Sequence, residues 1–302
     1  MSKLRVFEGF SGIGTQSMAL KRLGVDYEVV GIAEIDKFAI QSYMAIHGET
    51  KNYGDISKID PTELPDMDLF TYSFPCQDLS ISGKQRGMGE GTRSGLLYEC
   101  EKVITTKKPK YLLLENVKNL VGKKFKPDFD KWLEWLDSQG YCNYWKLLNA
   151  KDYGVPQNRE RVFVVSILGE DTYEFPEAKL LEKDVGDLLI NAILEKSNIV
   201  AQRGRYNQEG KVVQKFEARR DNLSNTLTTV QKDNLVFDGE KLRQLTPLEC
   251  WRLMGIADED FYKAKSVGIS DSQLYKQAGN AIVVDVLVGI FGNLFNTTEE
   301  AN

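Results

Sequence analysis

The sequence has only one histidine, His47, among its 302 residues. A single imidazole leaves little room for histidine-rich zinc sites, Ser-His-Asp triads or Cys-His dyads. We therefore expect no metal site. A nucleophilic cysteine in this chain would need support from a group other than histidine.

Cysteines and long apolar runs are also scarce. The four cysteines lie far apart and form no Cys-x-x-Cys pair, so we expect no disulfide framework and a cytoplasmic location. The longest apolar stretch, 282–295, is interrupted by polar residues and glycines, and the first residues carry no signal-peptide core. Neither a membrane span nor a secreted domain is expected.

An excess of basic charge is missing as well. Acidic residues outnumber basic ones by 44 to 39, which counts mildly against a nucleic-acid-binding protein. Two segments nevertheless carry local positive charge: 117–126 has four lysines and no acid, and 201–220 has a local charge of +4. Either run alone is readily a solvated face, but two in an acidic chain favour a confined polyanion-binding surface.

Short apolar runs alternate with helical patterns up to about residue 168. The expected strands are 4–7, 27–33, 69–73, 111–114, 143–148 and 162–167, and the expected helices are 15–23, 35–46, 95–106 and 128–139. This alternation predicts an α/β fold with a mostly parallel sheet covered on both faces. Residues 169–242 lack the pattern and predict a second domain of short strands and loops. Helical patterns return at 247–254 and 270–295, and the latter is expected to pack on the first domain.

A glycine-rich turn follows the first strand and holds Gly9, Gly12 and Gly14. A dinucleotide-binding turn would need another glycine at Ser17, so an NAD or FAD site is disfavoured. Acids end the next two segments, Glu34 and Asp55. The turn and the two acids favour a nucleoside without phosphates, such as S-adenosylmethionine; the alternative is that Asp55 caps a turn and Glu34 is solvated.

Three further segments carry reactive side chains. Cys76 follows the strand 69–73 and precedes a polar, glycine-rich loop of the kind that covers active sites, although a lone cysteine is often only structural. Glu115 follows three leucines, so partial desolvation is expected to raise its pKa, which would suit it to carry a proton. The alternative is a solvated acid at the end of a strand. Arg159 and Arg161 suit a base edge, a phosphate or a carboxylate, or else a surface pair bonded to Glu160 and water.

Six motifs stand in one order along the chain. They are Phe10-Ser-Gly-Ile-Gly14, Pro75-Cys-Gln77, Glu115-Asn-Val117, Gln157-x-Arg-x-Arg161, Arg243-Gln-Leu-Thr-Pro-Leu-Glu249 and Gly279-Asn280. Over about 4–168 and 222–296 the sequence resembles bacterial cytosine-5 DNA methyltransferases of restriction-modification systems. The resemblance implies a mixed, mostly parallel Rossmann-like sheet. It also implies a catalytic S-adenosylmethionine-binding domain at 1–168 and 263–302, and a target-recognition domain at 169–262.

The resemblance assigns roles to individual residues. Cys76 is implied as the nucleophile on carbon 6 of cytosine, Glu115 as the acid that contacts the ring nitrogen and amine, and Arg161 as the ligand of the base carbonyl. Arg159 is implied to orient the nucleophile or a backbone phosphate. The implied methyl-donor pocket comprises Phe10, Gly12, Gly14, Glu34, Asp55, Ile56, Pro75, Leu96 and Asn280, with S-adenosylhomocysteine as product.

The sequence departs from the family pattern at two positions. Thr15 stands where another glycine is common, and Ile35 stands where an aromatic residue is common. Neither change removes a catalytic group. Ile35 is expected to weaken stacking on the adenine of the donor.

The implied substrate is double-stranded DNA, from which the cytosine must be flipped out. The loop 76–94 is expected to close over the base, with DNA contacts from Gln77, Ser82, Lys84, Arg86 and Arg93. The basic residues of 201–220 are expected to contact the duplex: Arg203, Arg205, Lys211, Lys215, Arg219 and Arg220. We expect a monomer that recognises a specific sequence, which a cognate restriction endonuclease can share.

Four other functions compete with DNA cytosine-5 methylation. A tRNA cytosine-5 methyltransferase of the same fold would keep the same catalytic residues. A catalytically silent DNA-binding module is disfavoured by the complete set of Cys76, Glu115 and Arg161. A nicotinamide oxidoreductase is disfavoured by Ser17, and the Pro-Pro-aromatic motif of amino methyltransferases is absent.

Overall fold

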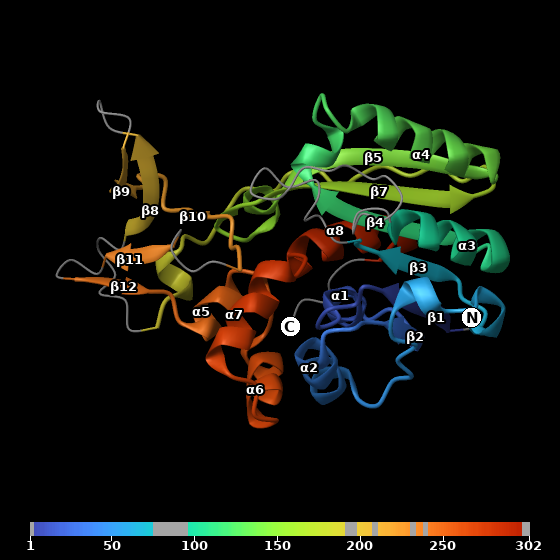
Figure 1. Ribbon diagram of the computed structural model, residues 1–302, viewed down its shortest axis with the longest axis horizontal. Coiled ribbons are helices and arrows are strands. Elements are labelled where there is room, and N and C mark those ends of the chain that lie inside the picture. Colours follow the sequence, from blue (N-terminus) through green and yellow to red (C-terminus); the bar gives the residue numbers. More distant parts are fainter. Residues whose placement is uncertain are drawn as a thin grey trace. The chain divides into compact units, whose positions relative to one another are not determined.

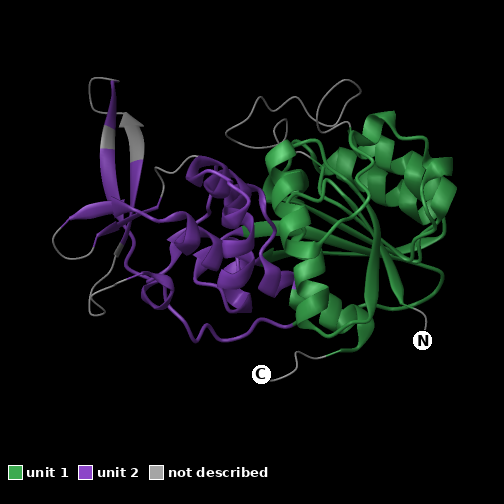
Figure 2. Cartoon of the chain, turned by 90° about the horizontal axis from the view of Figure 1, so that it is seen from below, with its two compact units in different colours: residues 1–148, 160–176, 288–302 green, residues 149–159, 177–287 purple. Residues whose placement is uncertain are grey.

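The computed structural model describes residues 3–74, 96–190, 198–206, 211–229, 234–237 and 241–297. The chain divides into two compact units (Figure 2). Unit 1 comprises Met1–Leu148, Glu160–Pro176 and Val288–Asn302, and unit 2 comprises Asn149–Arg159 and Glu177–Leu287. The predicted target-recognition domain, 169–262, falls mainly in unit 2, which also takes in 149–159 and 263–287.

Unit 1 is built on a six-stranded sheet (Figure 1). Its strand order is β2 (Tyr27–Ala33), β1 (Leu4–Gly9), β3 (Leu69–Tyr72), β4 (Tyr111–Val117), β7 (Glu160–Leu168) and β5 (Tyr141–Asn149). Strands β2, β1, β3 and β4 pair in parallel, whereas β7 runs antiparallel to β4. The predicted mixed, mostly parallel sheet is confirmed.

Helices follow the strands as the alternating pattern predicts. They are α1 (Thr15–Arg22), α2 (Lys37–His47), α3 (Leu97–Lys107) and α4 (Lys126–Ser138), with short 3₁₀ turns η1 (Ile56–Lys58) and η2 (Pro61–Glu63). One continuous apolar core joins β1, β3, β4 and β7 to α3 and α4. Phe70, Leu112, Ile104 and Trp132 all lie in it, each no more than 3% exposed. Burying these side chains is the main term that stabilises the unit.

The described residues of unit 2 form two small sheets and three complete helices. Strand β6 (Gln157–Asn158) pairs in parallel with β10 (Ser224–Asn225). The other sheet has the order β12 (Leu242–Gln244), β11 (Leu235–Phe237), β8 (Asn198–Tyr206) and β9 (Val212–Ala218), with antiparallel pairs. The helices are α5 (Pro247–Arg252), α6 (Asp258–Ser266) and α7 (Asp271–Asn280). Helix α6 was not predicted, because its residues are mostly polar and only Phe261 and Ala264 are buried.

The predicted helical stretch 270–295 is two helices, α7 and α8 (Val284–Phe295). Ala281 has an extended backbone with ψ 155° and ends α7. By length and composition, Asp271–Phe295 could cross a membrane, but the most apolar part of this stretch is 61% buried inside the protein. Such burial is what a core helix of a globular protein shows.

Candidate active site

The glycine-rich turn connects β1 to α1 through three residues with positive φ. These are Phe10 at 56°, Gly12 at 56° and Gly14 at 76°. A Cβ on Gly14 would lie 2.4 Å from His47 Nε2, so this position requires glycine. A Cβ on Gly12 would meet no atom of the described residues within 4 Å. The backbone is therefore open to a ligand at Gly12, and an aromatic residue in the left-handed region at Phe10 is a strained feature typical of binding sites.

Glu34 is fixed against this turn by main-chain donors. Its carboxylate accepts hydrogen bonds from the nitrogens of Gly12 (2.9 Å), Ile35 (2.8 Å) and Asp36 (2.8 Å). Asn52 orients Glu34 in turn: its Oδ1 accepts from the Glu34 nitrogen (3.2 Å) and its Nδ2 donates to the Glu34 carbonyl (3.0 Å). The sequence analysis missed Asn52, for which only its place just before Asp55 was a signal.

The other predicted donor-pocket residues are spread over several elements. Asp55 caps η1, because its Oδ1 accepts from the nitrogen and hydroxyl of Ser57 (3.1 and 2.8 Å), and these hydrogen bonds lower its pKa. Ile56 is buried, Ile35 is 73% exposed, and Leu96 is half-buried at the start of α3. Asn280 is the last residue of α7, in unit 2.

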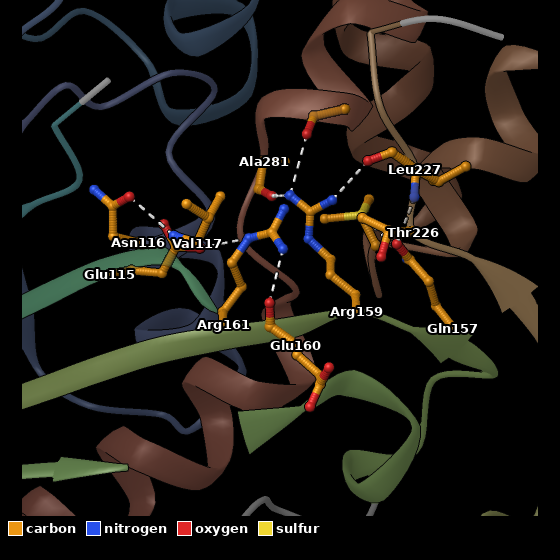
Figure 3. A network of polar contacts seen from close by, with 12 residues as sticks. Glu115, Asn116, Val117, Gln157, Arg159, Glu160, Arg161, Thr226, Leu227 and Ala281 are labelled. Atoms are coloured by element: carbon orange, nitrogen blue, oxygen red, sulfur yellow. Dashed lines mark hydrogen bonds and ion pairs between the residues drawn. The ribbon is translucent and has the colours of Figure 1, made fainter. Parts of the chain in front are cut away.

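Glu115 and Arg161 are brought together by the pairing of β4 with β7. Val117 lies opposite Arg161, and Glu115 lies opposite Phe163. Because Glu115 is two residues before Val117 on β4, its side chain lies on the same face of the sheet as that of Arg161 and is diagonal to it. Arg161 Nε lies 3.2 Å from Glu115 Oε1, and both side chains are largely buried (Figure 3). The register of β4 and β7 therefore brings a carboxylate and a guanidinium together on one face of the sheet.

Asn116 links this pair to the segment that carries the predicted nucleophile. Its side-chain nitrogen donates to the Phe74 carbonyl at 3.0 Å, and its Oδ1 accepts from the Val117 nitrogen at 2.9 Å. Phe74 is the last described residue before Pro75 and Cys76. The structure therefore anchors the chain at Phe74 to the strand that holds Glu115.

Several predicted site residues lie outside the described residues: Pro75, Cys76, Gln77, Ser82, Lys84, Arg86 and Arg93. The side chains of Arg203 and Arg205 also lie outside them, although their main chain belongs to β8.

Arg159 and Arg161 engage different parts of the chain. The Arg159 side chain is buried in unit 2, where its guanidinium donates to the carbonyls of Leu227 (2.8 Å), Gly279 (3.1 Å) and Ala281 (2.8 Å). Arg161 instead donates to Glu115, and from Nη1 to the Glu160 carbonyl at 2.8 Å. The Glu160 carboxylate accepts from Lys118 Nζ at 2.9 and 3.0 Å.

The motif from Arg243 to Glu249, to which the sequence analysis gave no role, forms a buried ion pair. Both carboxylate oxygens of the fully buried Glu249 accept from the Arg243 guanidinium at 2.8 Å. The same carboxylate accepts from the nitrogens of Thr246 (2.7 Å) and Ile190 (2.8 Å). This arrangement caps α5 and ties it to a neighbouring loop.

The basic segment 201–220 lies on the β8–β9 hairpin and just after it. Lys211, Lys215 and Arg220 are exposed. Arg219 is held by Asp221, with Nε 2.9 Å from Oδ1, and by Asn225, with Nη1 3.0 Å from its Oδ1. Lys211, Lys215 and Arg220 therefore present exposed side chains, whereas the Arg219 guanidinium is held by Asp221 and Asn225.

Glu8, on β1, is a buried acid that the sequence analysis did not single out. Its Oε1 accepts from the nitrogen (3.0 Å) and hydroxyl (2.8 Å) of Ser17 in α1. Desolvation by complete burial outweighs these bonds and raises the pKa of Glu8 to about 7. Across the described ranges, no group of three or more His, Cys, Asp or Glu residues could hold a metal ion.

Comparison with known proteins identifies the family to which this chain belongs. Residues 4–233 and 195–296 match the family described as C-5 cytosine-specific DNA methylase. The type II methyltransferase M2.ScrFI of Lactococcus lactis subsp. cremoris is 39% identical, over 97% of this chain and 99% of its own. The orphan methyltransferase M.SPRI of Bacillus phage SPR is 30% identical, over 98% of each chain.

Solved structures show the same fold at lower identity. A methyltransferase of Entamoeba histolytica, EhMeth, superposes with a TM-score of 0.75 at 18% identity and covers 98% of this chain and 99% of its own. The Dnmt2 methyltransferase of S. pombe gives a TM-score of 0.74 at 20% identity, over 97% and 99% of the two chains. On the family match and the full-length relatives together, this chain belongs to the C-5 cytosine-specific DNA methylases and is a DNA cytosine-5 methyltransferase.

Proposed function

We propose that this enzyme transfers a methyl group from S-adenosylmethionine to carbon 5 of a flipped-out cytosine, through a covalent adduct with Cys76. The observation that carries the proposal is the Glu115–Arg161 pair, held beside Phe74 by Asn116. The acid lies on β4, the strand to which the chain entering Cys76 is anchored, and the guanidinium lies on the neighbouring strand β7. The enzyme would act on double-stranded DNA in the cytoplasm as a monomer.

The residues of the glycine turn fit the proposed donor. When bound, S-adenosylmethionine supplies an electrophilic methyl group on its sulfonium. One oxygen of Glu34 accepts only the Gly12 donor among the contacts described above, which leaves it a lone pair for a ribose hydroxyl. The open space at Gly12 lets the ligand approach the backbone.

The chain's own groups then account for activation of the base. The Cys76 thiolate adds to carbon 6 of cytosine, and the electron pair displaced from the carbon 5–carbon 6 bond makes carbon 5 nucleophilic. Glu115 would meet the ring nitrogen and amine and share a proton with that nitrogen, while Arg161 would hold the base carbonyl. After methylation, loss of the proton from carbon 5 expels the thiolate and restores the ring.

Recognition of the DNA sequence is assigned to residues 169–262. The β8–β9 hairpin is a two-stranded ribbon, a form that fits a DNA groove. Three exposed cations belong to it or adjoin it: Lys211 just before β9, Lys215 on β9 and Arg220 just after it. The loop residues Lys84, Arg86 and Arg93 are proposed to contact phosphates near the flipped base, together with Gln77 and Ser82. Phosphate contacts of this kind position the duplex without choosing its sequence.

Expression in a host without cytosine methylation, followed by bisulfite sequencing, tests activity and target together. We expect 5-methylcytosine at one recurrent sequence with wild-type enzyme and none with Cys76→Ser, because no histidine supports a serine hydroxyl. A duplex with 5-fluorocytosine at the target should trap the wild-type enzyme covalently and leave Cys76→Ser free. Transfer to tRNA but not DNA in a substrate-swap assay, or methylation by Cys76→Ser at the wild-type rate, would contradict the proposal.

A further inference from the structure

Residues 224–227 of unit 2 are attached along their length to residues 156–158. The Ser224 nitrogen donates to the Pro156 carbonyl at 2.8 Å, and Thr226 Oγ1 donates to the Asn158 carbonyl at 2.7 Å. Strands β10 and β6 pair in parallel at the same place. This segment therefore depends on a piece of chain that precedes it by more than sixty residues.

Leu227 is held at both polar atoms of its main chain. Its N–H donates to Gln157 Oε1 at 2.9 Å, and its carbonyl accepts from Arg159 Nη1 at 2.8 Å (Figure 3). The Gln157 side chain is fully buried and Arg159 is 3% exposed. Because buried polar groups are costly when unpaired, these bonds specify one position for the segment.

The same two side chains join Leu227 to the helices of unit 2. Gln157 Nε2 donates to the Leu253 carbonyl at 2.6 Å, just after α5. Arg159 Nη2 donates to the carbonyls of Gly279 (3.1 Å) and Ala281 (2.8 Å), at the end of α7. Each side chain thus connects two separate stretches of backbone.

A close backbone contact supports the same arrangement independently. A Cβ on Gly279 would lie 2.7 Å from the carbonyl carbon of Thr228 and 2.8 Å from the Thr229 nitrogen. Only glycine allows the main chain of 228–229 to lie so close to α7. The end of the segment 224–229 therefore packs directly against α7 through main-chain atoms.

This segment follows the β8–β9 hairpin directly, and the Arg219 side chain after β9 bonds Asn225 within it. In this hairpin β8 and β9 pair antiparallel, with Val200 opposite Ala218 and Tyr206 opposite Val212. We propose that Gln157 and Arg159 are positioning residues for sequence recognition, because they fix the base from which the hairpin extends. The inference rests on the proposed function, in which 169–262 reads the target.

A phosphate contact by Arg159 would make a different prediction. Lysine binds phosphate as a point charge, so Arg159→Lys would preserve most of a phosphate contact. Lysine cannot reproduce the planar fork that reaches three carbonyls of two segments. Arg159→Lys therefore separates positioning from charge neutralisation, and Gln157→Ala tests the same clamp without any change of charge.

The experiment compares Arg159→Lys, Gln157→Ala and Gly279→Ala with the wild type in the full-length chain. The matched control is Arg252→Lys, an arginine of unit 2 paired with Asp258 at 2.6 Å and donating to the Leu188 carbonyl at 3.2 Å. Binding is measured at several salt concentrations for two unmethylated duplexes. One carries the target sequence found by bisulfite sequencing and the other a random sequence. Thermal unfolding and the ratio of target to near-target methylation are measured on the same samples.

We expect the three variants to lose at least tenfold of their preference for target over random DNA. Their affinity for random DNA and its salt dependence should match the wild type, and Arg252→Lys should keep its preference even if it unfolds at a lower temperature. Unchanged preference in two folded variants would overturn the inference. So would a folded Arg159→Lys that keeps the target preference and salt dependence of the wild type, because lysine preserves a phosphate contact but not the three carbonyl contacts. Failure of the wild type to methylate DNA would instead reject the proposed function.

Discussion

Arg161 Nε lies 3.2 Å from Glu115 Oε1 across the antiparallel pair β4–β7. The contact follows from register, because Val117 and Arg161 are directly opposite and Glu115 is two residues back on the same face. In the proposed mechanism a flipped-out cytosine would meet both groups at once. The pair would then supply an acid and a cation to one planar ring.

Glu115→Gln should lower the single-turnover rate of methyl transfer by about 10²–10⁴-fold, the range for loss of a positioned acid–base group. Glutamine keeps the shape but cannot share a proton with the ring nitrogen. The rate is measured with saturating donor and DNA. Glu160→Gln, which removes an exposed partner of Lys118, is the control and should stay near the wild-type rate. A Glu115→Gln rate within threefold of the wild type would remove Glu115 from the chemistry.

Glu34→Ala should weaken donor binding by about 1.5–3 kcal/mol, the range for a hydrogen bond to a charged acceptor. Catalysis should recover at high donor concentration, because the proposed contact of Glu34 is with the ribose of the donor and not with the reacting atoms. Calorimetry with S-adenosylmethionine measures the loss. Asn52→Ala should give a smaller loss in the same direction, since Asn52 only orients Glu34. Asp60→Ala, at the exposed cap of η2, is the control. Unchanged affinity in Glu34→Ala would place the ribose contact elsewhere.

Arg243→Ala should destabilise the protein by about 3–5 kcal/mol, because it leaves the buried Glu249 carboxylate without its cation. Burial raises the pKa of Glu249, but the hydrogen bonds from Arg243, Thr246 and Ile190 outweigh it and the net pKa is lowered. The stabilisation is therefore present above the unfolded-state pKa and is lost as the pH falls through the folded-state value. Urea unfolding at neutral and acidic pH measures both effects. Lys102→Ala, at the more exposed Lys102–Glu99 pair on α3, should cost about 0–1 kcal/mol.

Glu8→Gln should make the protein less sensitive to rising pH. Desolvation raises the folded-state pKa of Glu8 to about 7, above its ordinary value of 4.5. The folded state therefore holds a proton that the unfolded state has lost, and stability falls as the pH rises from about 4.5 to 7. The pKa difference corresponds to about 3 kcal/mol. Urea unfolding at pH 5 and pH 8 checks this, and an equal pH dependence for wild type and variant would contradict it.

The sequence could predict contacts that the local pattern of the sheet determines. Strand ends are marked by where apolar runs stop, so Glu34 could be placed just after β2 from the sequence alone. Glu115 was placed after the predicted strand 111–114, whereas β4 continues to Val117 and includes it. The glycines of the first turn likewise marked a backbone with positive φ. Turn capping by Asp55 was one of the two readings that the sequence left open.

Contacts between distant segments could not be predicted in the same way. Nothing near Arg159 indicates carbonyl partners at Leu227 and Gly279, because any main-chain carbonyl is equally suitable and only the tertiary fold chooses. Glu8 was missed because the predicted strand, 4–7, stopped before it, whereas β1 runs to Gly9. The local sequence also does not reveal which acid the following helix will cover. Asn52 was missed because an amide that orients another side chain has no motif of its own.

The basic cluster gives the last prediction, because its members differ in what already holds them. Lys215 is exposed on β9, whereas Arg219 is bonded to Asp221 and Asn225. Lys211→Ala and Lys215→Ala should weaken binding equally for target and random duplexes and reduce the salt slope by about 1 each, as phosphate contacts do. At least one of Arg203→Ala, Arg205→Ala and Arg220→Ala should cost about 1–3 kcal/mol of target affinity alone, as a bidentate contact to guanine does.

Arg219→Ala should lower stability and leave the salt slope for random DNA unchanged, because its guanidinium is already neutralised. All six variants are to be measured on both duplexes at two or more salt concentrations; wild-type affinity and an unchanged methylated sequence in every one would show that this cluster does not face DNA.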